Sequence, residues 1–211
     1  MTDEKQSDGP IWCIDFMMPG KKAKLIKYDL PAENDNDTRR KAADANREGE
    51  VLRPEYVPYR LYWEHKRMKP KRPALPDLFW IYNRSVIVTA RFKSLLEQFN
   101  IGRTRFFQVP LFDDGIEVID ETLFVLNLAE VRDVAVPEKS TAAREGSFGR
   151  WFISDIKSGA VVVKPNPMDG LDLVYQPKFS SAVFISDRLD KAMKAAKIRG
   201  ATRAKCKFDT A

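Results

Sequence analysis

The residues that could do chemistry in this sequence are few and scattered. His65 is the only histidine, whereas a nucleophilic triad needs a histidine beside its nucleophile and a hydrolytic zinc site usually needs two or three such ligands. Cys13 and Cys206 lie near opposite ends of the chain, so we expect reduced, buried thiols and no disulfide. Cys206, between Lys205 and Lys207, is the more reactive candidate because nearby cations favour the thiolate, although packing is the favoured role. We expect no catalytic residue, no metal site and no cofactor.

Short motifs for phosphate or acyl chemistry are also absent from the sequence. It contains no glycine-rich phosphate loop and no nucleophile elbow. Two acid pairs, Asp113-Asp114 and Asp120-Glu121, could serve acid–base catalysis, but adjacent acids in a turn are usually solvated. An enzyme whose site is assembled from residues distant in sequence is therefore less favoured than a binding protein, and we rank it third, after two different binding functions.

Length and composition are those of an ordinary globular protein. The 211 residues suffice for one well-buried core, with 44% hydrophobic and 31% charged residues. No apolar run reaches the roughly 18 residues of a membrane span, and the polar N-terminus leads into no apolar signal core. We expect a cytoplasmic protein that uses no membrane. Residues 1–10 are expected to form a disordered tail and residues 11–208 a single domain.

Charge is segregated along the chain, with a net charge of +6. The acidic part contains Asp113, Asp114, Glu117, Asp120, Glu121, Glu130, Asp133 and Glu138. The basic part follows Ile185 and contains Arg188, Lys191, Lys194, Lys197, Arg199, Arg203, Lys205 and Lys207. This pattern indicates either an acidic and a basic region on the surface or simply the solvated faces of a globular protein.

The first third of the chain, residues 11–73, reads as an irregular and variable part. Residues 11–18 predict a strand with a hairpin partner at 24–28, and residues 38–48 predict a weakly held surface helix or a flexible insert. The proline-rich segment 53–76 favours extended chain and mixes aromatic rings with a basic cluster at 66–72. Rings and cations together could bind nucleic acid, or the rings could pack beneath a loop while the lysines stay solvated.

Two later segments, 86–96 and 183–193, share the order strand, hydroxyl N-cap, helix. Thr89 and Ser186 are placed to cap the helices, and Arg91 and Arg188 follow them, where we expect arginines that bridge carboxylates for structural reasons. A glycine and another candidate strand follow each helix. With further strands predicted between the two segments, the fold class is α+β. We expect a mixed, mostly antiparallel sheet with two strand-helix-strand units related by an internal repeat.

The segments 75–78, 86–96, 106–110, 123–128, 183–189 and 198–200 together resemble one bacterial family. It is a polymorphic-toxin immunity protein family, formerly a domain of unknown function and named for a myxobacterial prototype. The resemblance covers roughly residues 74–208, which we expect to be an immunity-like core. It implies a cytoplasmic protein without enzymatic activity that binds a cognate toxin and occludes its active site, with a nuclease encoded by an adjacent gene as the candidate toxin.

Two surfaces compete as the toxin-binding site. An acidic surface could compete for a cationic nuclease site, and its candidates are Asp113, Asp114, Glu117, Asp120 and Glu121. Aromatic residues anchor many interfaces, and these candidates are Tyr59, Tyr62 and Trp63. The net charge of +6 argues against a wholly acidic mimic. The alternative function is a nucleic-acid-binding module that uses the 66–72 cluster and the basic C-terminus, although no nucleic-acid motif occurs; homodimerisation stays open.

Overall fold

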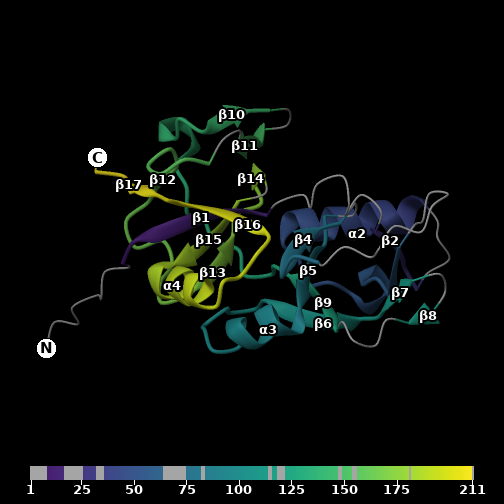
Figure 1. Ribbon diagram of the computed structural model, residues 1–211. Coiled ribbons are helices and arrows are strands. Elements are labelled where there is room, and N and C mark those ends of the chain that lie inside the picture. Colours follow the sequence, from purple (N-terminus) through teal and green to yellow (C-terminus); the bar gives the residue numbers. More distant parts are fainter. Residues whose placement is uncertain are drawn as a thin grey trace, which may run out of the picture.

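The computed structural model describes residues 9–16, 26–31, 36–63, 75–81, 84–113, 116–117, 122–146, 149–153, 156–180 and 182–210. Within these ranges it contains three α-helices and five small sheets whose strand pairs are mostly antiparallel (Figure 1). The predicted α+β class is confirmed. The mixed, mostly antiparallel pairing is confirmed as well, with the strands divided among several sheets.

Sheet A contains the N-terminal strand at its centre. Its strands, in order, are β13 (Leu173–Tyr175), β15 (Val183–Ser186), β1 (Ile11–Phe16) and β16 (Ala201–Lys205). The predicted hairpin of residues 11–18 with 24–28 is wrong, since β1 pairs with β15 and β16. The physical reason is that β1 is apolar on both faces, and a central strand between two layers can bury both.

Sheets B and C are continuous through the chain at Pro110. Sheet C contains, in order, β4 (Leu78–Trp80), β5 (Val86–Thr89), β9 (Leu123–Asn127) and β6 (Arg105–Val109). Sheet B contains β2 (Ile26–Asp29), β3 (Arg60–Trp63), β7 (Leu111–Asp113) and β8 (Ile116–Glu117). Sheet B lies at the end of the molecule away from the C-terminus (Figure 1).

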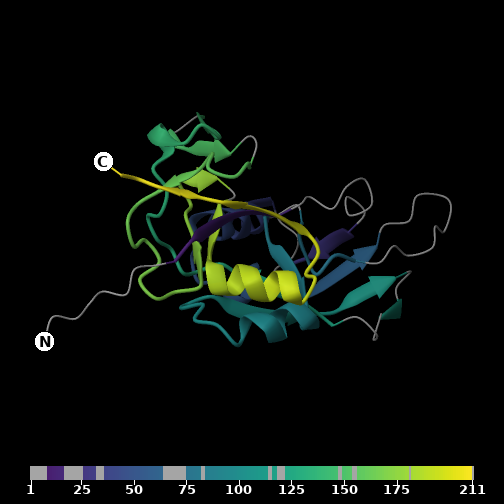
Figure 2. The same ribbon diagram turned by 60° about the vertical axis from the view of Figure 1, so that its left-hand side comes forward.

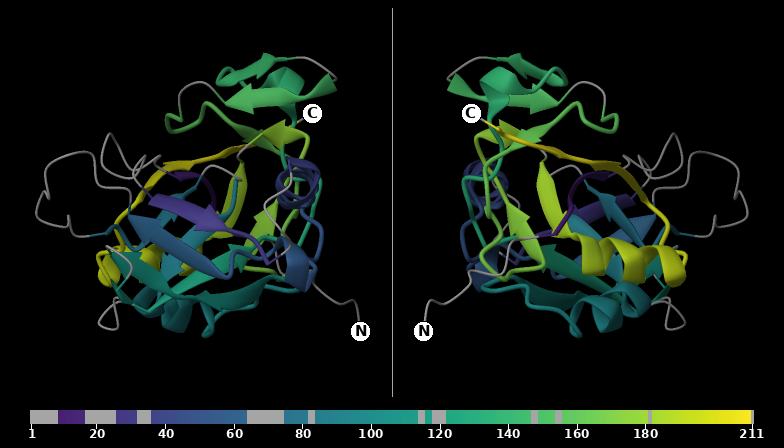
Figure 3. Two further views of the ribbon diagram at one scale, coloured as in Figure 1. Left: turned by 90° about the vertical axis from the view of Figure 1, so that its right-hand side faces the viewer. Right: turned by 90° about the vertical axis from the view of Figure 1, so that its left-hand side faces the viewer.

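Two smaller sheets complete the strands of the described chain. One contains β10 (Ala143–Glu145), β11 (Trp151–Ile153) and β14 (Phe179–Ser180), and the other pairs β12 (Val162–Val163) with β17 (Lys207–Phe208). Strands β10 and β11 project beside sheet A, as Figure 3 shows. Single turns of 3-10 helix occur at η1 (Pro54–Tyr56) and η2 (Pro137–Lys139).

Alternation of side chains along the strands divides the core into three layers. In β5, Val86 and Val88 face the layer shared with sheet A, whereas Ile87 faces the layer shared with sheet B. In β15, Phe184 faces a third layer beneath the smaller sheets. Sheet C is therefore buried on both faces, against sheet A on one side and sheet B on the other.

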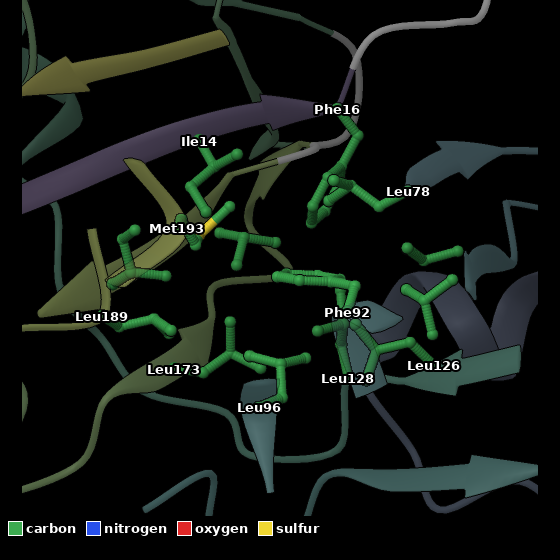
Figure 4. Close-up of a cluster of buried hydrophobic side chains, with 14 of the residues drawn as sticks. Ile14, Phe16, Leu78, Phe92, Leu96, Leu126, Leu128, Leu173, Leu189 and Met193 are labelled. Atoms are coloured by element: carbon green, nitrogen blue, oxygen red, sulfur yellow. The ribbon is translucent and has the colours of Figure 1, made fainter. Parts of the chain in front are cut away.

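The layer between sheets A and C receives both later helices, α3 (Ala90–Leu96) and α4 (Asp187–Ala195). Phe92 and Leu96 of α3 meet Leu189 and Met193 of α4 among strand side chains from both sheets (Figure 4). The helices lie side by side on the outside of this layer (Figure 2). Both predicted N-caps are confirmed: Thr89 Oγ accepts from the backbone amide of Phe92, and Ser186 Oγ accepts from that of Leu189.

The two strand-helix-strand units have the same arrangement in their sheets. In each sheet the strand before the helix and the strand after it run in one direction, with β9 or β1 between them. β4 and β13 occupy matching outer positions. Descent of the two units from a duplicated sequence stays a prediction.

The helix α2 (Asn36–Glu48) buries only Ala42 and Ala45, as its sequence indicates. Polar contacts hold its C-terminal end instead. Tyr175 Oη donates to the Arg47 carbonyl at 2.9 Å, and buried Asn127 bonds to the backbone of Glu50 and Leu52 at 2.8 and 3.1 Å. The helix is therefore attached to sheets A and C by side chains far away in sequence, which a local pattern cannot reveal.

Candidate partner-binding surface

The sequence-predicted site residues that the structure describes fall on or beside sheet B. Tyr59 precedes β3, Tyr62 lies within it, and Asp113 ends the neighbouring strand β7. Trp63 and Glu117 are placed by their backbone only, in β3 and β8. Asp114, Asp120 and Glu121 lie outside the described residues, as do His65 and the basic cluster at 66–72.

Pairing of β3 with β7 joins the aromatic and acidic candidates in one sheet. The two strands run parallel, with Leu61 opposite Leu111 and Tyr62 opposite Phe112. Leu61 and Leu111 are fully buried, so alternation places Tyr62 and Phe112 on the other face, where both are half-buried. Tyr62 and Asp113, described members of the two competing surfaces, therefore lie on neighbouring strands although they are about 50 residues apart in the chain.

Asp29 in β2 organises the start of β3. Its backbone carbonyl accepts from the Tyr59 amide at 3.0 Å, and its carboxylate accepts from Arg60 Nε at 2.6 Å. The Asp29 side chain is only 8% exposed. This hydrogen bond raises the pKa of the Arg60 guanidinium, so Arg60 stays charged.

Two tyrosine rings flank the Arg60 guanidinium. Its Cζ atom lies 5.4 Å from the ring centroid of Tyr59 and 5.9 Å from that of Tyr62. Both distances are within the range of a cation–π contact. Tyr59 is 48% exposed and the Arg60 side chain 45% exposed, so this Tyr-Arg-Tyr cluster (Tyr59, Arg60 and Tyr62) is open to a partner.

Strand β8 adds an exposed apolar side chain at the edge of the same sheet. Ile116 is 73% exposed and lies opposite Asp113 in the β7–β8 pairing. Together these residues combine aromatic, cationic, acidic and aliphatic groups within one small sheet, a mixture typical of protein interfaces.

Several of the segregated charges of the sequence form ion pairs within the fold. Glu130 is buried and pairs with Arg103 and Arg132, and buried Asp172 pairs with Arg188. In the basic C-terminal part, Lys191 pairs with Asp187, while Lys194 and Arg203 pair with buried Asp190. Much of this charge therefore holds the protein together.

Both cysteines are free and buried, as predicted. The chain nevertheless brings them to one core layer, because β1 and β16 are adjacent strands. Burial raises the pKa of the Cys13 thiol well above its ordinary value and that of Cys206 to about 12. Cys206 is thus a packing residue, and the cations beside it in sequence do not make it reactive.

Among the described residues, no group of three or more histidine, cysteine or acidic side chains is arranged to hold a metal ion. Within the same part of the chain, no helix has the length and hydropathy needed to cross a membrane.

Sequence reasoning missed Arg60 and Asp29. Arg60 was visible as a cation between Tyr59 and Tyr62, and this spacing is a usable signal. Asp29 could not be found, because only the antiparallel pairing of β2 with β3 places it opposite Arg60.

Comparison with known proteins agrees with the resemblance noted above. A family model described as an immunity protein family, Imm11, matches residues 30–207. This match begins well before residue 74, so it includes α2 and β3 as well as the expected core. No curated protein matches the chain. Because the family match spans most of the sequence, the chain belongs to the Imm11 immunity protein family.

Proposed function

We propose that this chain binds a cognate bacterial toxin and neutralises it by occluding the toxin's active site, with no catalysis of its own. The Imm11 match over residues 30–207 carries this proposal, because the family has an immunity function and implies a toxin partner. An inhibitor needs a stable surface of fitting shape and charge, and it needs no reactive group.

The surface that we propose for this role lies on sheet B and its connecting segments. It unites both sets of sequence candidates: Tyr59, Tyr62, Trp63, Asp113, Asp114, Glu117, Asp120 and Glu121. Support comes from the register of β3, β7 and β8, which makes the described members neighbours, and from the exposure of Tyr59 and Ile116. Aromatic side chains in such a surface supply large contact area at a small entropic cost.

Further parts of the proposal concern the partner and the setting. We propose a nuclease toxin encoded by an adjacent gene, whose cationic site the acids at 113–121 would approach by charge complementarity. Immunity from within the producing cell requires a cytoplasmic protein. The working unit is a single domain over residues 11–208, acting as a monomer or a homodimer.

Co-expression with the product of the adjacent gene tests this function. We expect growth to be restored and a stable complex to survive size-exclusion chromatography. Purified toxin should lose its activity in proportion to added protein, and substrate should compete with binding. A harmless neighbour that forms no complex would refute the assignment to this partner.

A further inference from the structure

We infer that Arg60 anchors the toxin interface and that its ligand is an aspartate or glutamate side chain of the toxin. This inference rests on the proposed function and adds the partner's chemistry. It starts from the arrangement of the guanidinium, which is held in place before any partner arrives.

Within the described chain, the Arg60 side chain donates a hydrogen bond only through its Nε atom. It donates to Asp29 at 2.6 Å, and the ion pair uses the same atom. Both terminal amino groups therefore keep their donors for another acceptor. Because Asp29 is nearly fully buried and tyrosine rings lie near the guanidinium, the planar fork is oriented in advance, and binding costs less side-chain entropy.

Arg132 provides an internal comparison. It too pairs with a buried acid, Glu130, and its side chain is 46% exposed against 45% for Arg60. However, Arg132 uses its terminal Nη2 atom at 3.1 Å. No aromatic ring stacks on it among the described residues. The two arginines therefore differ in whether the outer edge of the fork is left for a ligand.

A carboxylate fits this fork better than a phosphate does. Two parallel N–H groups match the two oxygens of a carboxylate in a bidentate pair. A phosphate would also match the fork, but it carries more negative charge than a carboxylate and is therefore repelled more strongly by the Asp29 carboxylate, which already pairs with Arg60. The tyrosines supply the apolar surroundings in which a single ion pair between proteins is strengthened.

The test measures binding of the adjacent gene's purified, catalytically inactive toxin to full-length variants by calorimetry. We expect R60A to weaken binding about 10- to 100-fold, and R60K, which keeps the charge but loses the fork, to lose most of the same affinity. R132A is the matched control and should change affinity by less than about twofold. Unfolding midpoints check that each variant is folded; if R60A is not, R60K carries the test.

A double-mutant cycle then identifies the ligand. Each surface aspartate and glutamate of the toxin is changed to alanine, and one of these changes should weaken binding to wild type but have no further effect on R60A. Unchanged binding by R60A while wild type still binds would overturn this inference and leave the proposed function standing. Failure of wild type to bind or protect would end both. Loss of Arg60-dependent binding after nuclease digestion would instead assign the fork to nucleic-acid phosphate.

Discussion

The centre of the molecule and its sheet B end use buried aspartates in opposite ways. At the centre, the carboxylates of Asp77 and Asp172 connect the two strand-helix-strand units through hydrogen bonds. At the end, Asp29 holds an arginine whose outer donors stay available. A buried aspartate can therefore either join two parts of a fold or prepare a binding surface, depending on which donor atoms of its partner it leaves unused.

Asp77 and Asp172 connect the two strand-helix-strand units reciprocally. Asp77, just before β4, accepts from the Arg199 amide beyond α4 at 2.8 Å. Asp172, just before β13, accepts from the Asn100 amide beyond α3 at 2.8 Å. Each aspartate also bonds to the arginine that follows the N-cap of its own unit, Arg91 or Arg188, as the sequence analysis expected of these arginines.

Removing the Asp172 carboxylate should have the largest effect on stability. Arg188 binds it with two nitrogens, and Ser186 and the Asn100 amide also donate to it, so D172A removes a buried acceptor that serves four part-buried hydrogen bonds. We expect a loss of about 3 kcal/mol in unfolding free energy, measured by urea denaturation. D44A, which removes a surface carboxylate of α2, is the control and should cost less than about 0.5 kcal/mol. Equal losses would contradict a special role for Asp172.

Alkaline pH should also lower the unfolding free energy, through the two buried cysteines. In the unfolded chain the thiols ionise near the ordinary pKa of 9.0. In the folded protein burial raises the pKa of both thiols, that of Cys206 to about 12, so they stay protonated. Their contribution is therefore fully present below pH 9 and is lost as pH rises toward 12. Unfolding free energy should fall by about 3 kcal/mol between pH 9 and 10.5, from roughly 1.4 kcal/mol per pH unit for each of the two thiols once it is fully ionised in the unfolded chain. The double variant C13A/C206A should flatten this slope; an unchanged slope would assign it to other groups.

Asp77 should matter less than Asp172. Its contacts with Arg91 and Thr89 are each 3.4 Å long, and Arg91 reaches it with one nitrogen instead of two. We expect D77A to cost about 2 kcal/mol in the same denaturation experiment. A loss equal to that of D172A would show that the backbone contacts, which are alike in both units, outweigh the ion pairs.

The smallest effect concerns the sheet B end and appears in binding. I116A removes an exposed side chain, so unfolding free energy should change by less than about 0.5 kcal/mol, while toxin affinity should fall about threefold. V51A, which trims an exposed side chain outside sheet B, is the control and should leave affinity unchanged. Equal affinities for I116A and wild type would place β8 outside the interface.

Local sequence signals predicted elements well and long-range pairing poorly. The caps at Thr89 and Ser186 and the strand at 123–127 follow from neighbouring residues, and the structure contains them. The pairing of β1 with β15, and of β3 with β7, joins residues far apart in the chain, and no local pattern encodes such a choice. For the same reason the sequence assigned Tyr62 and Asp113 to two separate candidate surfaces, and it did not indicate Asp29 as a candidate.

Hydrogen–deuterium exchange on the complex with the adjacent gene's toxin tests most directly whether sheet B is the binding surface. The account predicts new protection in peptides covering residues 59–63 and 111–113, with α3, α4 and the β10–β11 strands unchanged. Protection confined to β10–β11, or to the α3–α4 side, would contradict it.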